Sequence, residues 1–228
     1  MQQLPLEVQL ADYAVFDSYY AGQNAAAVHA VSALTSATER TVIWLWGNSD
    51  TGKSHLLQAL AADAAARGVS STYLPLSDSS MQPGFLEGLS GVDIICIDDI
   101  NAVAGRADWE AALFRLYEEL FQTGSRLVVA AAMAPGGAGL ALPDLESRLS
   151  SGATFRLHGL SDEDSVAALQ KRAAWRGLNL PEDTAAYLLT RVNRSPSTLF
   201  ALLDRLDREA LVAQRRLTIP FVKSVLDA

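Results

Sequence analysis

Short apolar runs alternate with helical segments over roughly the first two thirds of the chain. The apolar runs are rich in β-branched and aromatic residues at successive positions, which is typical of strands buried on both faces. Because buried strands separated by helices form parallel sheets that are covered on both sides, we expect an α/β domain. The expected strands are 40–46, 71–76, 92–97, 126–132 and 154–157, the expected helices are 24–38, 53–67 and 108–122, 83–89 is a short helical or loop piece, and 135–143 is a loop.

The pattern changes after Gly159, where no further strand signal occurs. Ser161 is followed by three acidic residues, as at the start of a helix, and Pro181 and Pro196 suit first helical turns. Thr218 precedes a last expected helix. We therefore expect a tail over 1–12, an α/β domain over 13–158 and a small all-helical domain over 159–228.

The composition is that of a folded chain with an acidic surplus. Of the 228 residues, 50% are hydrophobic and 19% are charged, as in globular proteins. Eighteen basic and 26 acidic side chains leave a net charge of −8, which disfavours direct, sequence-independent binding to DNA or to anionic membranes. The sequence has no basic signal region and no apolar stretch near the ~18 residues that span a bilayer, so we expect a cytoplasmic protein. The single cysteine, Cys96, is expected to be buried.

The segment 47–54 matches the phosphate-binding pattern G-x-x-x-x-G-K-[ST] at every fixed position. It directly follows an expected strand and directly precedes an expected helix. Glycines allow backbone N–H groups to face a phosphate, the helix start adds the positive end of its dipole, and Lys53 reaches the outer phosphates. The predicted phosphate loop consists of Gly47, Asn48, Ser49, Asp50, Thr51, Gly52, Lys53 and Ser54.

Two carboxylates follow another expected strand. Asp98 and Asp99 end the run 94–99, at the edge of the sheet where ligands of open α/β sheets collect. Together with the Ser54 hydroxyl, Asp98 is a candidate ligand for Mg²⁺, and Asp99 is a candidate to polarise an attacking water. The sequence therefore predicts a purine nucleoside di- or triphosphate with Mg²⁺, and the three histidines show no spacing for another metal.

Several segments resemble AAA+ proteins, and among them the bacterial replication initiator DnaA. Residues 16–24 resemble the segment that lines the adenine pocket in that family, which implies nucleotide contacts for Tyr20 and Asn24. Residues 98–100 resemble its Walker B ending, and 142–149 its arginine-finger segment. The stretches that resemble the DnaA-related Hda-type proteins are 160–164, 178–183 and 214–223.

The resemblance implies a regulatory function. Hda-type proteins bind an adenine nucleotide, ADP or ATP, and are tethered to the DNA-loaded sliding clamp, where they stimulate ATP hydrolysis by DnaA. Arg148 is then the expected arginine finger, which stabilises charge on the transferring phosphoryl group of the initiator. DnaA has a helix-turn-helix domain after its AAA+ module, whereas this sequence stops at Ala228, so we expect DNA to be reached only indirectly. A homodimer is compatible with the sequence.

The resemblance also assigns a function to the N-terminal segment. Gln3, Leu4, Pro5 and Leu6 resemble the short peptides that insert into the apolar groove of the clamp. Pro5 favours an extended Leu4, which suits such a groove. The segment departs from the fuller peptide pattern because no aromatic residue closes it.

Two departures from the AAA+ pattern concern hydrolysis by the protein itself. The expected strand at 126–132 ends in alanines, where AAA+ proteins place a polar sensor, and Ser197 stands where a second sensor arginine is expected, with Arg194 as a candidate substitute. We therefore expect weak hydrolysis. An autonomous P-loop ATPase, such as a helicase loader or a remodelling motor, is the alternative, and the intact phosphate loop and acidic pair favour it; a nucleotide kinase is the third candidate.

Overall fold

The structure is a computed structural model that describes residues 14–227. The expected clamp-binding residues Gln3, Leu4, Pro5 and Leu6 lie outside the described residues. The chain divides into two compact units. The first contains residues 24–157 with 14–16, and the second contains residues 158–227 with the short segment 17–23.

The first unit is built on a five-stranded sheet in the order β2-β3-β4-β1-β5, and every pair is parallel. This confirms the predicted parallel α/β architecture. The strand at the centre of the order, β4, separates the end of β1 from the end of β3. The strands are β1 (Val42–Trp46), β2 (Ser71–Pro75), β3 (Ile94–Asp98), β4 (Arg126–Ala131) and β5 (Ala153–Arg156).

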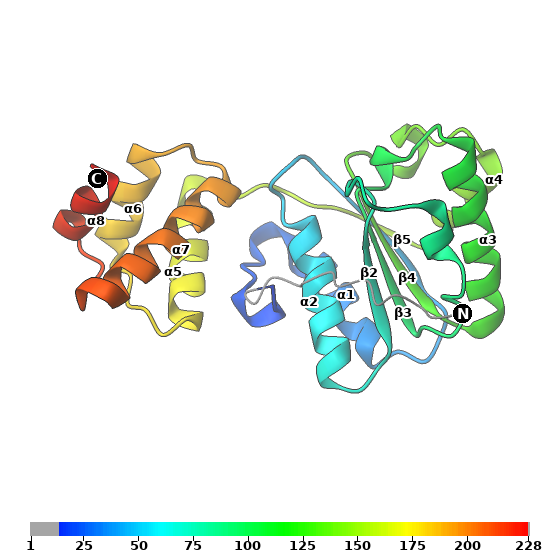
Figure 1. The fold of residues 1–228 in the computed structure, drawn as a ribbon, viewed down its shortest axis with the longest axis horizontal. Helices are drawn as coiled ribbons and strands as arrows, with labels where there is room; N and C mark the ends of the chain where they lie inside the picture. The colour runs from blue at the N-terminus through cyan, green and yellow to red at the C-terminus, as the bar shows by residue number, and fades with distance from the viewer. Residues whose placement is uncertain (1–13, 228) are drawn as a thin grey trace. The chain divides into compact units, whose positions relative to one another are not determined.

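Helices cover both faces of this sheet. Figure 1 shows α1 (Ala25–Ser32) and α2 (Lys53–Ala66) on one face, and α3 (Ala107–Thr123) and α4 (Pro143–Leu149) on the other. On β1 the side chain of Trp44 is packed in the cluster formed with α3, and Leu45, its neighbour in sequence, is also fully buried. The central strands are therefore apolar on both faces, as predicted. Cys96 in β3 is free and buried, also as predicted, and burial raises the pKa of its thiol.

The first helix is shorter than its sequence pattern predicts. The sequence favours a helix over 24–38, but α1 ends at Ser32 and continues as a 3-10 turn, η3 (Ala33–Thr35). The carbonyl groups of Leu34 and Ala37 instead accept hydrogen bonds from Arg126 Nη1, at 2.7 and 2.6 Å. A helix that reached Thr38 would have bonded the Leu34 carbonyl to its own backbone N–H groups, whereas here a long-range cation bonds to both carbonyl groups beyond the end of α1.

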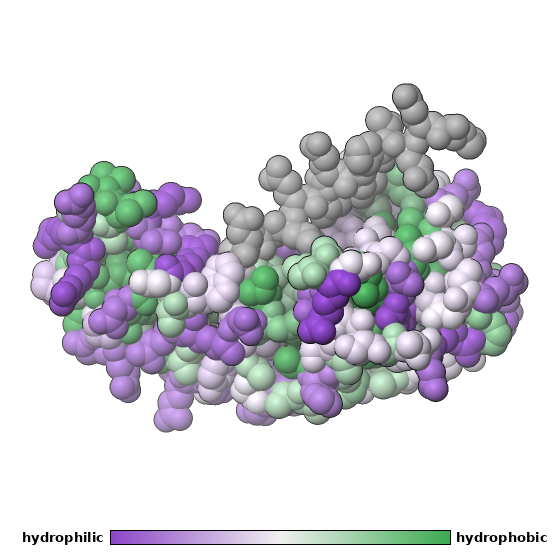
Figure 2. Space-filling model, turned by 90° about the horizontal axis from the view of Figure 1, so that it is seen from below, coloured by the Kyte–Doolittle hydropathy of each residue, from purple (hydrophilic) through white to green (hydrophobic). Residues whose placement is uncertain are grey.

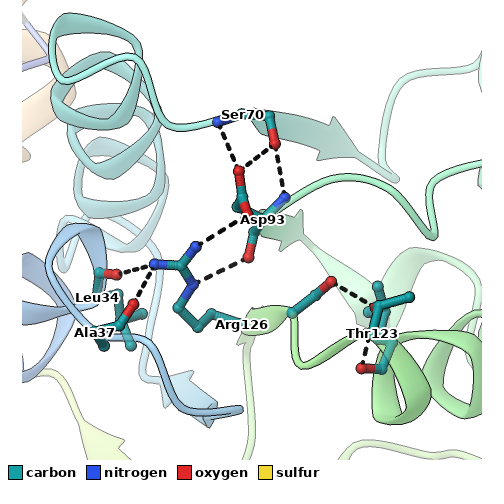
Figure 3. Close-up of polar contacts among 8 residues, drawn as sticks. Leu34, Ala37, Ser70, Asp93, Thr123 and Arg126 are labelled. Carbon is teal, nitrogen blue, oxygen red and sulfur yellow. Dashed lines mark hydrogen bonds and ion pairs between the residues drawn. The ribbon is translucent and has the colours of Figure 1, made fainter.

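Arg126, at the start of β4, bonds to the segment that follows α1 and to Asp93, which directly precedes β3 (Figure 3). Its Nε donates to the backbone oxygen of Asp93 at 3.1 Å, and its Nη2 lies 3.6 Å from the Asp93 carboxylate. Ser70 donates to the same carboxylate through its hydroxyl, at 2.5 Å, and its backbone N–H, at 3.1 Å. Arg126 is buried, and these partners compensate the loss of water around its charge.

Besides η3, the described residues contain five more short 3-10 helices. The loop expected at 135–143 contains one of them and then begins α4 at Pro143, a favoured first helical residue. These turns are η1 (Phe16–Ser18), η2 (Gly22–Asn24), η4 (Pro83–Leu86), η5 (Ile100–Ala102) and η6 (Pro135–Gly137).

The second unit has four α-helices around an apolar core, as the sequence predicts. Its first helix begins with a reciprocal capping box, in which Ser161 and Asp164 each accept a hydrogen bond from the other's backbone N–H. At the left of Figure 2 the visible surface of this unit is largely hydrophilic with hydrophobic patches, since most of its apolar side chains pack inside but Trp175, Leu211 and Val212 are exposed. The helices are α5 (Asp162–Trp175), α6 (Glu182–Arg191), α7 (Pro196–Ala213) and α8 (Ile219–Leu226). In the part of the chain that the structure describes, all helices are too short or too polar to cross a membrane.

Candidate nucleotide site

The predicted phosphate loop connects the end of β1 to the start of α2. Gly47 has no room for a side chain, because a Cβ atom there would lie 2.6 Å from the backbone oxygen of Leu157. Gly52, at the N-cap of α2, has a φ of 88°, a left-handed conformation that glycine adopts without strain. Asp50 is also left-handed, with a φ of 61°. The backbone therefore requires glycine at both fixed positions of the motif.

Lys53 lies folded against the loop. Its Nζ donates to the backbone oxygens of Gly47 and Asn48, both at 2.8 Å, and the Thr51 hydroxyl donates to the Asn48 oxygen at 2.9 Å. Burial lowers the pKa of Lys53, and the nearby carboxylates of Asp98 and Asp99 oppose that shift. The Lys53 ammonium group is therefore partly shielded from water, and Lys53 lines the cavity in front of the phosphate loop.

A cavity of about 340 Å³ opens in front of the loop. Its volume lies in the range of small-molecule sites. The residues of its wall carry three hydroxyl groups and one ammonium group, together with the carboxylates of Asp50 and Asp99. The lining residues are Gly47, Ser49, Asp50, Thr51, Gly52, Lys53, Ser54, His55, Asp99 and Ala132.

Asp98 ends β3 and is almost fully buried, with 1% of its surface exposed. Its Oδ2 accepts a hydrogen bond from the Tyr73 hydroxyl at 2.7 Å, and its Oδ1 accepts one from the backbone N–H of Asp99 at 3.0 Å. Ser54 also forms a side-chain hydrogen bond with it. Burial raises the pKa of Asp98, although these hydrogen bonds counteract the effect. The structure thus brings together the two side chains predicted to bind Mg²⁺.

Asp99 has a different environment from its neighbour. It adopts a left-handed backbone with a φ of 54°, which directs its side chain to the cavity wall. Its Oδ2 accepts a hydrogen bond from the Ser77 hydroxyl at 2.8 Å. The pair therefore consists of one enclosed carboxylate and one that borders the cavity.

The donor set at this edge fits Mg²⁺ in the company of a nucleotide. The pair formed by Ser54 and Asp98 supplies a hydroxyl and one oriented carboxylate. Magnesium sites in proteins use one or two carboxylates and take their other ligands from phosphates and water. Within residues 14–227 there is no group of three or more His, Cys, Asp and Glu side chains that could form an all-protein metal site.

Tyr20 and Asn24, the expected adenine contacts, lie in different units. The Tyr20 hydroxyl donates to Asp164 Oδ1 at 3.0 Å, which joins segment 17–23 to the capping box of α5. This hydrogen bond raises the pKa of Tyr20, and hydrogen bonds led by the one from Ser161 lower the pKa of Asp164. Asn24 is buried just before α1. Contact of either side chain with an adenine ring stays a prediction.

Arg148, the expected arginine finger, lies in the last turn of α4. Its Nε donates to Glu118 Oε1 on α3, and its guanidinium carbon lies 4.8 Å from the centroid of the Phe114 ring. The hydrogen bond to Glu118 raises the pKa of Arg148. The side chain is 37% exposed, and its Nη groups have no hydrogen-bond partner among residues 14–227. Its action on a second protein stays a prediction.

Sequence reasoning missed the residue that occupies the end of β4. The alanines there have no polar side chain, but Asn101 comes from the turn after β3: its Oδ1 accepts from the backbone N–H of Ala132 at 2.6 Å, and its Nδ2 donates to the Ala138 oxygen at 3.2 Å. Tyr73 and Ser77 were missed for the same reason. Their contacts come from the adjacency of strands, which a spacing motif does not encode.

The helical unit places the two candidates for a second sensor near the start of α7. Arg194 Nη1 donates to Asp162 Oδ2 at 2.7 Å, and both side chains are exposed. Ser195 caps α7, and its hydroxyl lies 3.1 Å from that of Ser197. Arg194 is therefore held by α5 of its own unit.

Comparison with known proteins gives two family matches. Residues 10–158 match the model of the bacterial DnaA ATPase domain, and residues 162–226 match the model of the Hda lid domain. Domain III of the Thermotoga maritima replication initiation protein DnaA has a similar fold, with a TM-score of 0.79 at 19% identity over 96% of this chain and 97% of that one.

Two longer DnaA structures are also similar in fold. One is replication initiator DnaA bound to AMPPCP and single-stranded DNA, with a TM-score of 0.73, and the other is AMPPCP-bound DnaA from Aquifex aeolicus, with a TM-score of 0.70. Each is 19% identical over 87% of this chain. The chain spans 66% of the length of each.

Proposed function

The chain belongs to the family of the bacterial DnaA ATPase domain and carries an Hda-type lid, and from this we propose that it is a negative regulator of replication initiation. In this proposal the protein binds ADP or ATP with Mg²⁺, is tethered to the sliding clamp, and stimulates ATP hydrolysis by DnaA. The observation that carries the proposal is the succession of a DnaA-type unit with a complete phosphate loop and an Hda-type lid.

The nucleotide site supports this proposal through its charge arrangement. The backbone N–H groups of 47–52 and the start of α2 would hold the phosphates, and Lys53 would exchange its two carbonyl partners for phosphate oxygens. Ser54 and Asp98 would hold Mg²⁺, which neutralises phosphate charge when bound. Asp99, at the cavity wall, is suited to orient a water.

The action on DnaA would pass through Arg148. An arginine supplied by a second protein stabilises the charge that develops on the γ-phosphoryl oxygens, an effect of about 10³–10⁵ in rate in related systems. Anchorage of Nε by Glu118 leaves the Nη groups to face a phosphate. The clamp tether is assigned to Gln3, Leu4, Pro5 and Leu6, DNA is contacted only through the clamp, and the site of action is the cytoplasm.

The test is a DnaA hydrolysis assay with clamp loaded on DNA. Unsubstituted protein should accelerate the conversion of DnaA–ATP to DnaA–ADP, and Arg148→Ala should abolish the acceleration. The matched control is Arg115→Ala, which removes an exposed arginine from α3. Equal stimulation by Arg148→Ala and the unsubstituted protein would show that the finger assignment is wrong.

An autonomous ATPase is the second candidate function. The observation in its favour is that Lys53, Asp99 and the Ser54–Asp98 pair gather at one site. Against it stands the end of β4, where the amide of Asn101 is already bonded to backbone groups on both sides. Turnover by the purified protein alone, abolished by Lys53→Ala, would favour this candidate.

A further inference from the structure

The strand at the edge of the sheet supplies a hydroxyl group to Asp98. β2 pairs with β3 in parallel, with Tyr73 opposite Cys96 and Pro75 opposite Asp98. The long Tyr73 side chain spans this two-residue offset, so that its hydroxyl lies 2.7 Å from Asp98 Oδ2. A phenol on a neighbouring strand therefore touches the carboxylate that ends β3.

Hydrogen bonds fix the Asp98 carboxylate on both of its oxygens. Tyr73 occupies Oδ2, and the backbone N–H of Asp99 occupies Oδ1 at 3.0 Å. The Tyr73 hydroxyl is itself oriented, because it accepts a hydrogen bond from Gln58 Nε2 on α2 at 3.4 Å while it donates to Asp98. Two successive hydrogen bonds, from Gln58 on α2 to Tyr73 and from Tyr73 on β2 to Asp98, thus set the plane of the Asp98 carboxylate, a residue that is only 1% exposed.

We propose that Tyr73 is a positioning residue for Asp98, through which it sets the affinity of the site for a nucleotide in the presence of Mg²⁺. The inference rests on the proposed nucleotide function. Mg²⁺ requires near-ideal octahedral geometry, so a carboxylate free to rotate holds it and its water less well. Loss of a partner that orients a metal ligand typically lowers metal affinity 10- to 100-fold.

The experiment compares nucleotide affinity with and without Mg²⁺ for the full chain. Isothermal titration with ADP, in buffer with excess Mg²⁺ and in buffer with EDTA, gives two dissociation constants and their ratio. Tyr73→Phe keeps the ring and removes the hydroxyl. We expect this variant to lose about tenfold or more of the Mg²⁺ enhancement, with the constant in EDTA changed by less than about twofold.

Two further variants set the limits of the measurement. Asp98→Asn should abolish the enhancement, and Tyr187→Phe, the same chemical change in the helical unit, should leave both constants unchanged. The ratio is taken on one preparation and the binding stoichiometry reports the folded fraction, so partial unfolding of Tyr73→Phe does not mimic the expected result.

The possible outcomes separate the two proposals. Full Mg²⁺ enhancement in Tyr73→Phe, or an equal weakening in both buffers, would overturn the assignment of Tyr73 while leaving the nucleotide site intact. Failure of the unsubstituted protein to bind ADP, or binding without any effect of Mg²⁺, would instead contradict the proposed site itself.

Discussion

Arg148 on α4 donates a hydrogen bond through Nε to Glu118 on α3, and the Phe114 ring lies beneath the same guanidinium group. The start of α4 is held by the same helix, because buried Glu110 accepts hydrogen bonds from the backbone N–H groups of Ala141 and Leu142, at 2.7–3.0 Å. Helix α3 therefore fixes α4 at both of its ends.

Glu118→Gln should reduce the stimulation of DnaA without abolishing it. The substitution removes the charge that aims Arg148 but keeps the arginine itself. Because exposed ion pairs contribute little, we expect roughly a two- to fivefold decrease in the stimulated rate. The assay is hydrolysis of DnaA–ATP with DNA-loaded clamp, and Glu119→Gln, on the exposed side of α3, is the matched control. An increase in the rate would mean that Glu118 holds Arg148 away from the nucleotide of DnaA.

Lys53→Ala should weaken nucleotide binding. A hydrogen bond to a charged group contributes about 1.5–3 kcal/mol, which corresponds to at least tenfold weaker ADP binding. The measurements are titration with ADP and mass spectrometry of the nucleotide released from purified protein. Lys171→Ala, on the exposed surface of α5, is the control. Retained affinity in Lys53→Ala would contradict the proposed use of the phosphate loop.

The sequence contains most of the information about the sheet and the phosphate loop. Runs such as 94–97 in β3 are apolar at successive positions, and the motif at 47–54 specifies its own backbone, since Gly47 and Gly52 occupy places that a side chain would disturb. Local patterns of this kind can be read without a structure.

The partners that orient the site residues follow from strand order instead. Tyr73 and Asp98 are 25 positions apart, and they meet only because β2 pairs with β3. Glu118 and Arg148 meet because α3 packs against α4. Arg126 is another such partner, since it comes from β4 and bonds to the Leu34 and Ala37 carbonyl groups, which lie beyond the end of α1 but within the range that helical periodicity predicts.

Deletion of residues 1–8 should abolish capture of the protein by immobilised sliding clamp. The proposed peptide contains Gln3, Leu4 and Leu6, and the apolar groove of the clamp would lose both leucines in this variant. Nucleotide binding should be unchanged, which provides the control for folding. A double substitution, Leu4→Ala with Leu6→Ala, should weaken capture in the same direction. Undiminished capture of the shortened protein would refute the tether.

Ser70→Ala should destabilise the first unit in a pH-dependent manner. Two hydrogen bonds from Ser70 lower the pKa of Asp93, the carboxylate that faces Arg126. A folded-state pKa below the unfolded value of ~3.9 stabilises the protein above that value, and the stabilisation is lost as the pH falls through the folded-state pKa. Ser70→Ala retains its backbone N–H but lacks the hydroxyl, so its urea midpoint should be lower than that of the unsubstituted protein at pH 7.

The difference between the two urea midpoints should shrink as the pH falls from about 5 to below 3. At low pH Asp93 becomes protonated, so the unsubstituted protein loses the stabilisation that the Ser70 hydroxyl gives to the charged carboxylate. Circular dichroism at pH 7, 5 and 3 measures these midpoints. Ser32→Ala is the control, since its hydroxyl donates to the backbone oxygen of His29 and not to a carboxylate, so its effect should not change over this pH range. A difference that stays constant over this pH range would mean that Ser70 acts through packing or through the hydrogen bond that its hydroxyl accepts from the Asp93 backbone N–H, and not through the charge of Asp93.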